Sequence, residues 1–148
     1  MEFLKVNNKL HVNTNKLDKK ITKDHFILEN NLAYAGKHLL VDLWDTSFDN
    51  KITTLKKIIK SAVHVANATL LHLHLHRFGR AQGISGVAVL AESHISVHTW
   101  PERDYIAFDI FMCGDTIPEA AARKIIEELR PKNKIINLIK RGTINIDK

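Results

Sequence analysis

The order of hydrophobic and polar residues along the chain predicts alternating strands and helices. Two segments carry apolar residues at the spacing of an amphipathic helix, and they are residues 49–68 and 116–131. Six segments show the short apolar runs or the period of two that are typical of strands, and they are residues 37–44, 69–78, 84–93, 94–102, 105–113 and 134–142. Only short breaks separate the four central strands, which favours antiparallel pairing.

This pattern predicts one domain of the α+β class. Helices that cover one face of a mainly antiparallel sheet form a two-layer sandwich. A chain of 148 residues with 45% hydrophobic residues is long enough to build one such domain with a real core. Residues 1–33 are polar and rich in Asn and Lys, so we interpret them as an N-terminal extension that precedes a domain of residues 34–148.

Composition narrows the setting and the partners. No apolar run approaches the ~18 residues of a membrane-spanning helix, and the first residues lack the apolar centre of a signal peptide. We therefore expect a cytoplasmic protein without a membrane partner. The positive charges that give the chain its net charge of +6 lie outside its central part, because residues 61–120 hold three basic and six acidic side chains. This distribution argues against nucleic acid and suits a cationic small molecule.

The segment "LAESHISVHTWPE" (residues 90–102) concentrates serines, histidines and acids where one predicted strand follows another. Three explanations compete: a metal site, a hydrolase nucleophile with its base, and a backbone that reacts with itself. A serine hydrolase does not fit, because "GISG" around Ser85 is not the G-x-S-x-G elbow and no helix follows it.

A metal site draws its support from "LHLHLH", where His72, His74 and His76 fall on one face of a strand. "HISVH" lacks the glutamate of the helical metalloprotease motif. The alternative is a polar face at a sheet or subunit contact, and we expect no metal. The lone cysteine, Cys113, cannot form an intrachain disulfide, so any special role it has is that of a thiol.

A longer run of residues carries a family resemblance. "GISGVAVLAESHISVHTWPERDYIAFDIFMCGD" (residues 83–115), with "GKHLLVDLW" and "ANATLLHLHLHRFG" upstream, resembles the bacterial S-adenosylmethionine decarboxylase proenzymes. The resemblance covers roughly residues 34–142. These proenzymes are self-processing and depend on a pyruvoyl group, so the resemblance favours the backbone that reacts with itself.

The resemblance implies how the chain makes its cofactor. Ser93 attacks the carbonyl of Glu92 and turns the peptide into an ester, and β-elimination then cuts the chain between residues 92 and 93. The dehydroalanine that remains hydrolyses to a covalent pyruvoyl group derived from Ser93. By position in the family motif, His98 and Ser85 assist processing, with His98 as the base for elimination.

The resemblance also implies the reaction. The pyruvoyl carbonyl forms a Schiff base with the amine of S-adenosylmethionine and acts as the electron sink when carbon dioxide leaves. Cys113 matches the proton donor, Phe78 and Trp100 match aromatic contacts to adenine and sulfonium, and Glu102 is a candidate for the ribose hydroxyls or the positive charge. The product supplies aminopropyl groups for spermidine synthesis, and the implied assembly is a homodimer of processed protomers.

Two alternatives remain at this point. The nearer one is a pyruvoyl-dependent arginine or ornithine decarboxylase, because "LWDTS" places Asp45 where many relatives carry a smaller residue, and an extra acid suits a guanidinium or ammonium group. The retained Phe78, Trp100 and Glu102 favour the adenosyl substrate. The distant alternative is a non-enzymatic metal- or partner-binding module built on the histidine strand.

Overall fold

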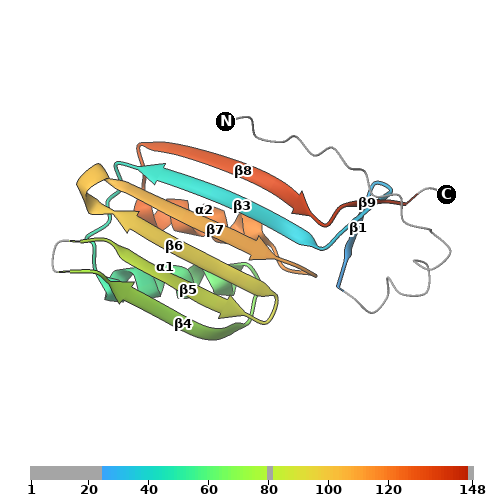
Figure 1. The fold of residues 1–148 in the computed structure, drawn as a ribbon, viewed down its shortest axis with the longest axis horizontal. Helices are drawn as coiled ribbons and strands as arrows, with labels where there is room; N and C mark the ends of the chain where they lie inside the picture. Colours follow the sequence, from blue (N-terminus) through green and yellow to red (C-terminus); the bar gives the residue numbers. More distant parts are fainter. Residues whose placement is uncertain (1–24, 80–81, 147–148) are drawn as a thin grey trace, which may run out of the picture.

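The computed structural model describes residues 25–79 and 82–146. Its main sheet has the strand order β4-β5-β6-β7-β3-β8, and every neighbouring pair is antiparallel (Figure 1). The strands are β3 (Gly36–Trp44), β4 (Leu70–Arg77), β5 (Ile84–Leu90), β6 (Ser93–Trp100), β7 (Tyr105–Met112) and β8 (Asn133–Arg141). A short 3-10 helix, η2 (Pro101–Arg103), joins β6 to β7.

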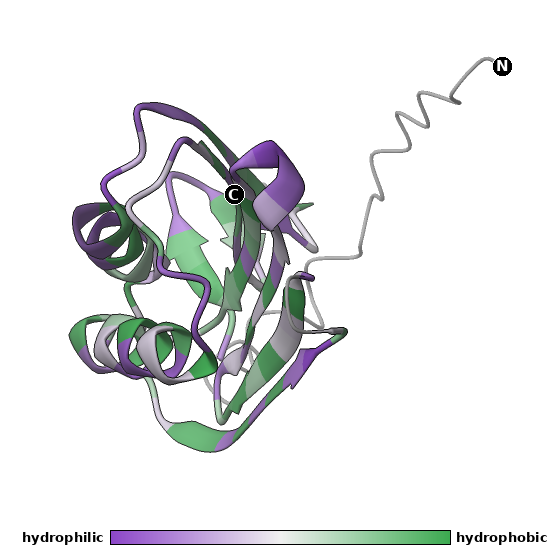
Figure 2. Cartoon of the chain, turned by 90° about the vertical axis from the view of Figure 1, so that its left-hand side faces the viewer, coloured by the Kyte–Doolittle hydropathy of each residue, from purple (hydrophilic) through white to green (hydrophobic). Residues whose placement is uncertain are grey.

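Both helices, α1 (Ile52–Val65) and α2 (Pro118–Leu129), lie on the same side of this sheet (Figure 2). Side chains in β7 alternate between buried and half-buried along the whole strand, and the buried ones join the core under the helices. The predicted two-layer α+β sandwich is therefore confirmed. No described element covers the opposite side of the sheet, which we call the open face.

The hairpin between β5 and β6 differs from the predicted strand boundaries. Sequence patterning placed one strand at residues 84–93 and the next at 94–102, which is wrong in its boundary. β5 ends at Leu90, Ala91 and Glu92 form a two-residue turn, and β6 begins at Ser93, which pairs with Leu90. Apolar periodicity does not detect so tight a turn, because the turn carries neither glycine nor proline.

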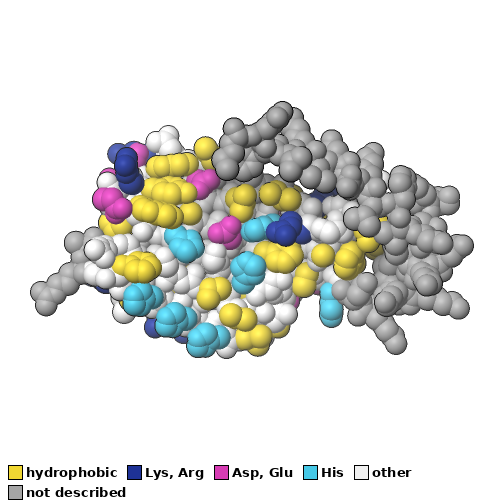
Figure 3. Space-filling model, in the orientation of Figure 1, with side chains coloured by type: hydrophobic (Ala, Val, Ile, Leu, Met, Phe, Trp, Pro, Cys, Tyr) yellow, Lys and Arg dark blue, Asp and Glu magenta, His cyan; other side chains and the backbone are white. Residues whose placement is uncertain are grey.

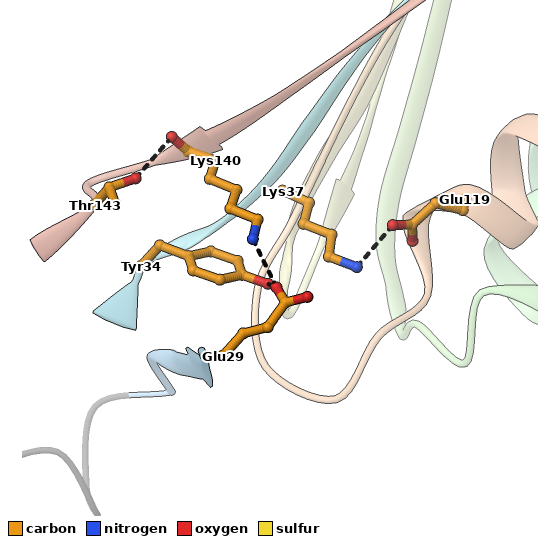
Figure 4. Close-up of polar contacts among 6 residues, drawn as sticks. All are labelled: Glu29, Tyr34, Lys37, Glu119, Lys140 and Thr143. Atoms are coloured by element: carbon orange, nitrogen blue, oxygen red, sulfur yellow. Dashed lines mark hydrogen bonds and ion pairs between the residues drawn. The ribbon is translucent and has the colours of Figure 1, made fainter. Parts of the chain in front are cut away.

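A second, three-stranded sheet contains β1 (Ile27–Glu29), β2 (Leu32–Tyr34) and β9 (Ile144–Asn145). Figure 4 shows the polar contacts around it: the Glu29 carboxylate accepts hydrogen bonds from the Tyr34 hydroxyl at 2.8 Å and from Lys140 Nζ at 2.7 Å. Nearby, Lys37 pairs with Glu119 of α2 at 2.7 Å. The expected domain boundary between residues 33 and 34 falls within β2, and residues 1–24 lie outside the described residues.

The two tyrosines of the chain make its stability depend on pH in the alkaline range. Burial raises the pKa of Tyr34 from 10.0 to about 12, and its hydrogen bond to Glu29 acts in the same direction. Burial and the hydrogen bond to Asp42 likewise raise the pKa of Tyr105 to about 12. Both phenols are therefore protonated in the folded protein at pH values where the unfolded chain ionises.

We expect the folding free energy to keep this contribution below pH 10 and to lose it between pH 10 and about 12, because only the unfolded chain releases these protons in that window. The ultraviolet absorbance of tyrosinate measures the effect directly. The native protein should show almost no tyrosinate at pH 10.5, where about three quarters of free phenols are ionised, while the denatured protein should show a large signal. A native titration centred near pH 10 would contradict the burial described here.

Candidate active site

The peptide bond between Glu92 and Ser93 lies at the tight turn that joins β5 to β6. Ser93 adopts a φ of 136°, a backbone conformation that residues other than glycine rarely adopt and that costs free energy. The carbonyl oxygen of Glu92 accepts two hydrogen bonds from Cys113, one from its backbone N–H at 3.1 Å and one from its thiol at 3.2 Å. Two donors aimed at one carbonyl oxygen are the arrangement that stabilises an oxyanion.

Neighbouring segments fix this turn in place. The Glu92 carboxylate accepts a hydrogen bond from the backbone N–H of Thr69 at 2.9 Å, and the N–H of Ala91 donates to the carbonyl of Thr69 at 3.0 Å. On the other side, the Thr116 hydroxyl donates to the carbonyl of Cys113 at 2.8 Å. A cavity of about 400 Å³ opens beside the bond, and its lining residues are His25, Asn67, Ala91, Glu92, Cys113, Gly114, Asp115 and Thr116.

A second group of predicted site residues lies at the far end of the same strands. Ser85 in β5 pairs with His98 in β6, and the Ser85 hydroxyl is 2.8 Å from His98 Nδ1. Both side chains line a cavity of about 510 Å³ together with Phe78, Trp100 and Glu102. The structure therefore brings together in one cavity five of the nine residues that the sequence suggested for processing, catalysis or substrate binding.

The two groups do not meet within one chain. Ser93 is the first residue of β6 and His98 is five residues further along, so their backbones are about 17 Å apart at the rise of an extended strand. In Figure 1, β6 runs from the end of the sheet nearest β1 to the end that carries η2. The Glu92–Ser93 peptide with Cys113 is at the first end, and the Ser85–His98 pair is at the second.

Asp45 lies in neither cavity. It directly follows β3 and has a φ of 52°. Its carboxylate accepts a hydrogen bond from the Asn133 side chain at 3.4 Å, and the Asp45 N–H donates to the carbonyl of Asp104 at 2.9 Å. The side chain that the sequence offered as a partner for a basic substrate thus contacts Asn133, the first residue of β8, outside both cavities.

Sequence reasoning missed two of the polar groups that bind Glu92. The N–H of Cys113 and the N–H of Thr69 are backbone groups, and a backbone donor has no residue type by which a sequence reveals it. The stacking of Tyr105 against Trp100 was missed as well. The sequence does contain a signal for it, because the two residues flank the short connection between two predicted strands.

The histidine strand faces the solvent in this chain. His72, His74 and His76 are exposed on the open face, where a row of histidine side chains follows β4 along one edge of the sheet (Figure 3). Among residues 25–79 and 82–146, no group of three or more His, Cys, Asp or Glu side chains is arranged to hold a metal ion. No helix in this part of the chain is long and apolar enough to cross a membrane.

Comparisons with known proteins agree with this geometry. The family model for S-adenosylmethionine decarboxylase matches residues 37–142. An S-adenosylmethionine decarboxylase proenzyme of Methanococcus aeolicus is 44% identical over 76% of this chain and 98% of that protein. One of Prochlorococcus marinus is 45% identical over 74% of this chain and 89% of that protein.

A solved structure supports the same assignment. The crystal structure of the adenosylmethionine decarboxylase from Aquifex aeolicus superimposes with a TM-score of 0.69 at 32% identity, and the match covers 78% of this chain and 97% of that one. These proteins support S-adenosylmethionine over arginine or ornithine as the family's substrate. With the family model matched over most of its length, the chain belongs to the S-adenosylmethionine decarboxylase family and is a carboxy-lyase.

Proposed function

We propose that this chain cuts itself between Glu92 and Ser93 and then decarboxylates S-adenosylmethionine with a pyruvoyl group derived from Ser93. One observation carries the proposal: the Glu92 carbonyl, which has to become an electrophile, already accepts two hydrogen bonds from Cys113, and Ser93 is held in a strained conformation. Attack of a serine on an amide is slow, because the hydroxyl is a weak nucleophile and the amide is a poor electrophile. Hydrogen bonds that polarise the carbonyl and a strained backbone at Ser93 both lower this barrier.

The cut needs only groups of the chain and water. Ser93 Oγ bonds to the carbonyl carbon of Glu92, its proton passes to a base, and the C–N bond breaks to leave an ester and a free amine. Removal of the Ser93 α-proton then expels the Glu92 carboxylate and leaves a dehydroalanine. Water then hydrolyses the imine form of this dehydroalanine, so that the nitrogen departs as ammonia and a pyruvoyl carbonyl remains. The Cys113 donors stabilise the negative charge that develops on the Glu92 oxygen during the first step.

A base for these steps comes from a second copy of the chain. His98, with Ser85 at 2.8 Å, has the right chemistry but lies about 17 Å from Ser93 along its own strand, which is too far to act on it. The row of paired residues through Ser96 and Asp109 crosses the sheet about halfway between Ser93 and His98. A two-fold axis along that row would lay one open face on the other and bring His98 of the partner subunit to Ser93.

The edge strand β8 supports this assembly. The same row continues through Leu40 of β3 to Asn137 of β8, so Ile135 and Ile139 lie two residues to either side of the axis. These isoleucines are on the open face and are 52% and 44% exposed. In the proposed dimer each Ile135 faces Ile139 of the partner subunit, which removes apolar surface from water.

The mature site uses the same residues in new roles. A pyruvoyl group supplies an electron sink for the carbanion that decarboxylation creates. The cut converts the Glu92 carbonyl into a carboxylate that can move away, so the Cys113 thiol becomes free to protonate the substrate carbon. Phe78, Trp100 and Glu102 offer two aromatic surfaces and an acid to an adenosyl cation in the larger cavity.

The first test is the mass of the purified protein. We expect two fragments, residues 1–92 and residues 93–148, the second lacking a free amine and reacting with carbonyl reagents. Ser93→Ala should remain full length because it has no nucleophile, whereas Ser61→Ala in α1 should be cut like the wild type. Efficient cleavage of Ser93→Ala would refute self-processing by this residue.

The second test concerns the substrate. On one preparation, kcat/KM for S-adenosylmethionine should greatly exceed the values for arginine and ornithine. Asp45→Gly should leave this activity nearly unchanged, because Asp45 binds Asn133 outside the cavity. Trp100→Ala should lose about 1–3 kcal/mol of transition-state binding, the scale of one lost aromatic contact. A processed protein that ignores S-adenosylmethionine and needs Asp45 to act on a basic amino acid would contradict the proposal.

A further inference from the structure

Three aromatic rings stack in a row across neighbouring strands at the cavity end of the open face. Trp100 of β6 pairs with Tyr105 of β7, and Tyr105 pairs with Trp44 of β3. Each pair of rings has its centroids 5.1 Å apart and its planes inclined by 24°. We call these three residues the aromatic row. Offset stacking at this separation is the favourable geometry for two aromatic rings.

Tyr105 is the fixed centre of the aromatic row. Its ring has Trp100 on one side and Trp44 on the other, and its hydroxyl donates a hydrogen bond to Asp42 Oδ1 of β3. With a pKa of about 12, this hydroxyl is protonated throughout the neutral range, so it can donate this hydrogen bond. A ring that is stacked on both faces and tethered at its hydroxyl has little freedom to turn.

Trp100 is the outer member of the aromatic row and the one that reaches the cavity. It lines the 510 Å³ cavity opposite Phe78, a side chain that is 64% exposed, and it is itself 40% exposed although Tyr105 covers part of it. A ligand with a planar ring and a separate positive charge that enters between Phe78 and Trp100 would extend the row by one more ring. The carboxylates of Asp42 and Glu102 near this end favour a positive ligand.

We propose that Tyr105 and Trp44 are positioning residues for the substrate, which hold the Trp100 ring in the plane that receives the adenine of S-adenosylmethionine. This inference rests on the proposed function of the cavity. Neither Tyr105 nor Trp44 contacts the scissile peptide, Cys113 or the Ser85–His98 pair by a hydrogen bond or a ring contact among the described residues. Their loss should therefore weaken substrate binding and leave the chemical steps in place.

The experiment compares two substitutions of Tyr105 in the self-cleaved enzyme. Tyr105→Leu removes the ring and should raise KM for S-adenosylmethionine about tenfold while kcat stays within about twofold. Tyr105→Phe keeps the ring and should recover most of the wild-type KM. Trp44→Leu, which removes the last ring of the row, should raise KM by a smaller factor, and it serves as the second variant if Tyr105→Leu does not fold.

A binding measurement separates this inference from the function on which it rests. The dissociation constant of methylthioadenosine, which carries the adenine but no amino acid, should rise in Tyr105→Leu by about the same factor as KM. If the wild type binds methylthioadenosine but does not decarboxylate S-adenosylmethionine, the proposed function fails and the dissociation constants still test the aromatic row. Unchanged KM and dissociation constant in folded Tyr105→Leu and Trp44→Leu would overturn the inference, as would a Tyr105→Phe variant as impaired as Tyr105→Leu.

Discussion

The two hydrogen bonds from Cys113 to the Glu92 carbonyl are the interaction on which the rest of the site depends. They exist because β6 and β7 pair in a register that places Ser93 opposite Met112. Cys113, the residue that follows β7, therefore lies next to the turn that contains Glu92. A shift of one residue in that register would turn every side chain of β6 to the other face and remove both donors. The buried core under the helices therefore fixes the chemistry indirectly, by fixing the register.

A second constraint follows from the length of β6. A strand is a rigid spacer of about 3.3 Å per residue, so residues five apart cannot act on the same atom. The Glu92–Ser93 peptide and the Ser85–His98 pair therefore lie too far apart on one sheet to act together within one chain. In the dimer that we propose, a two-fold partner laid on the open face would turn this separation into an advantage, because each chain would supply one half to each of two complete sites.

Much of the fold could be predicted from the sequence. The period of two along the strands and the helical spacing of the two apolar faces follow directly from burial on one side of a sheet, and the α+β sandwich was confirmed. The family was also predicted correctly, because the residues from Gly83 to Asp115 form a long and specific run. Ser85, His98, Phe78, Trp100 and Glu102 do share one cavity.

Other features had no sequence signal, for physical reasons. The turn at Ala91 and Glu92 lacks the usual turn residues, so the strand boundary was misplaced, and the φ of Ser93 is imposed by pairing on both sides of the turn. Backbone donors are the same at every position and cannot be read from residue types. Asp45 looked like a ligand for a basic group, but the way β3 ends turns it towards Asn133.

The claim that the site is shared between two chains can be tested by co-expressing two variants that are inactive alone. Ser93→Ala lacks the nucleophile and His98→Ala lacks the base, so neither should be cut when it is produced by itself. In a mixed dimer, Ser93 of the His98→Ala chain meets an intact His98 of the partner subunit, so intact-mass analysis should find that chain cut and the Ser93→Ala chain whole. If the mixture remains uncut although mixed dimers form, or if His98→Ala alone is cut as fast as the wild type, the shared site is contradicted.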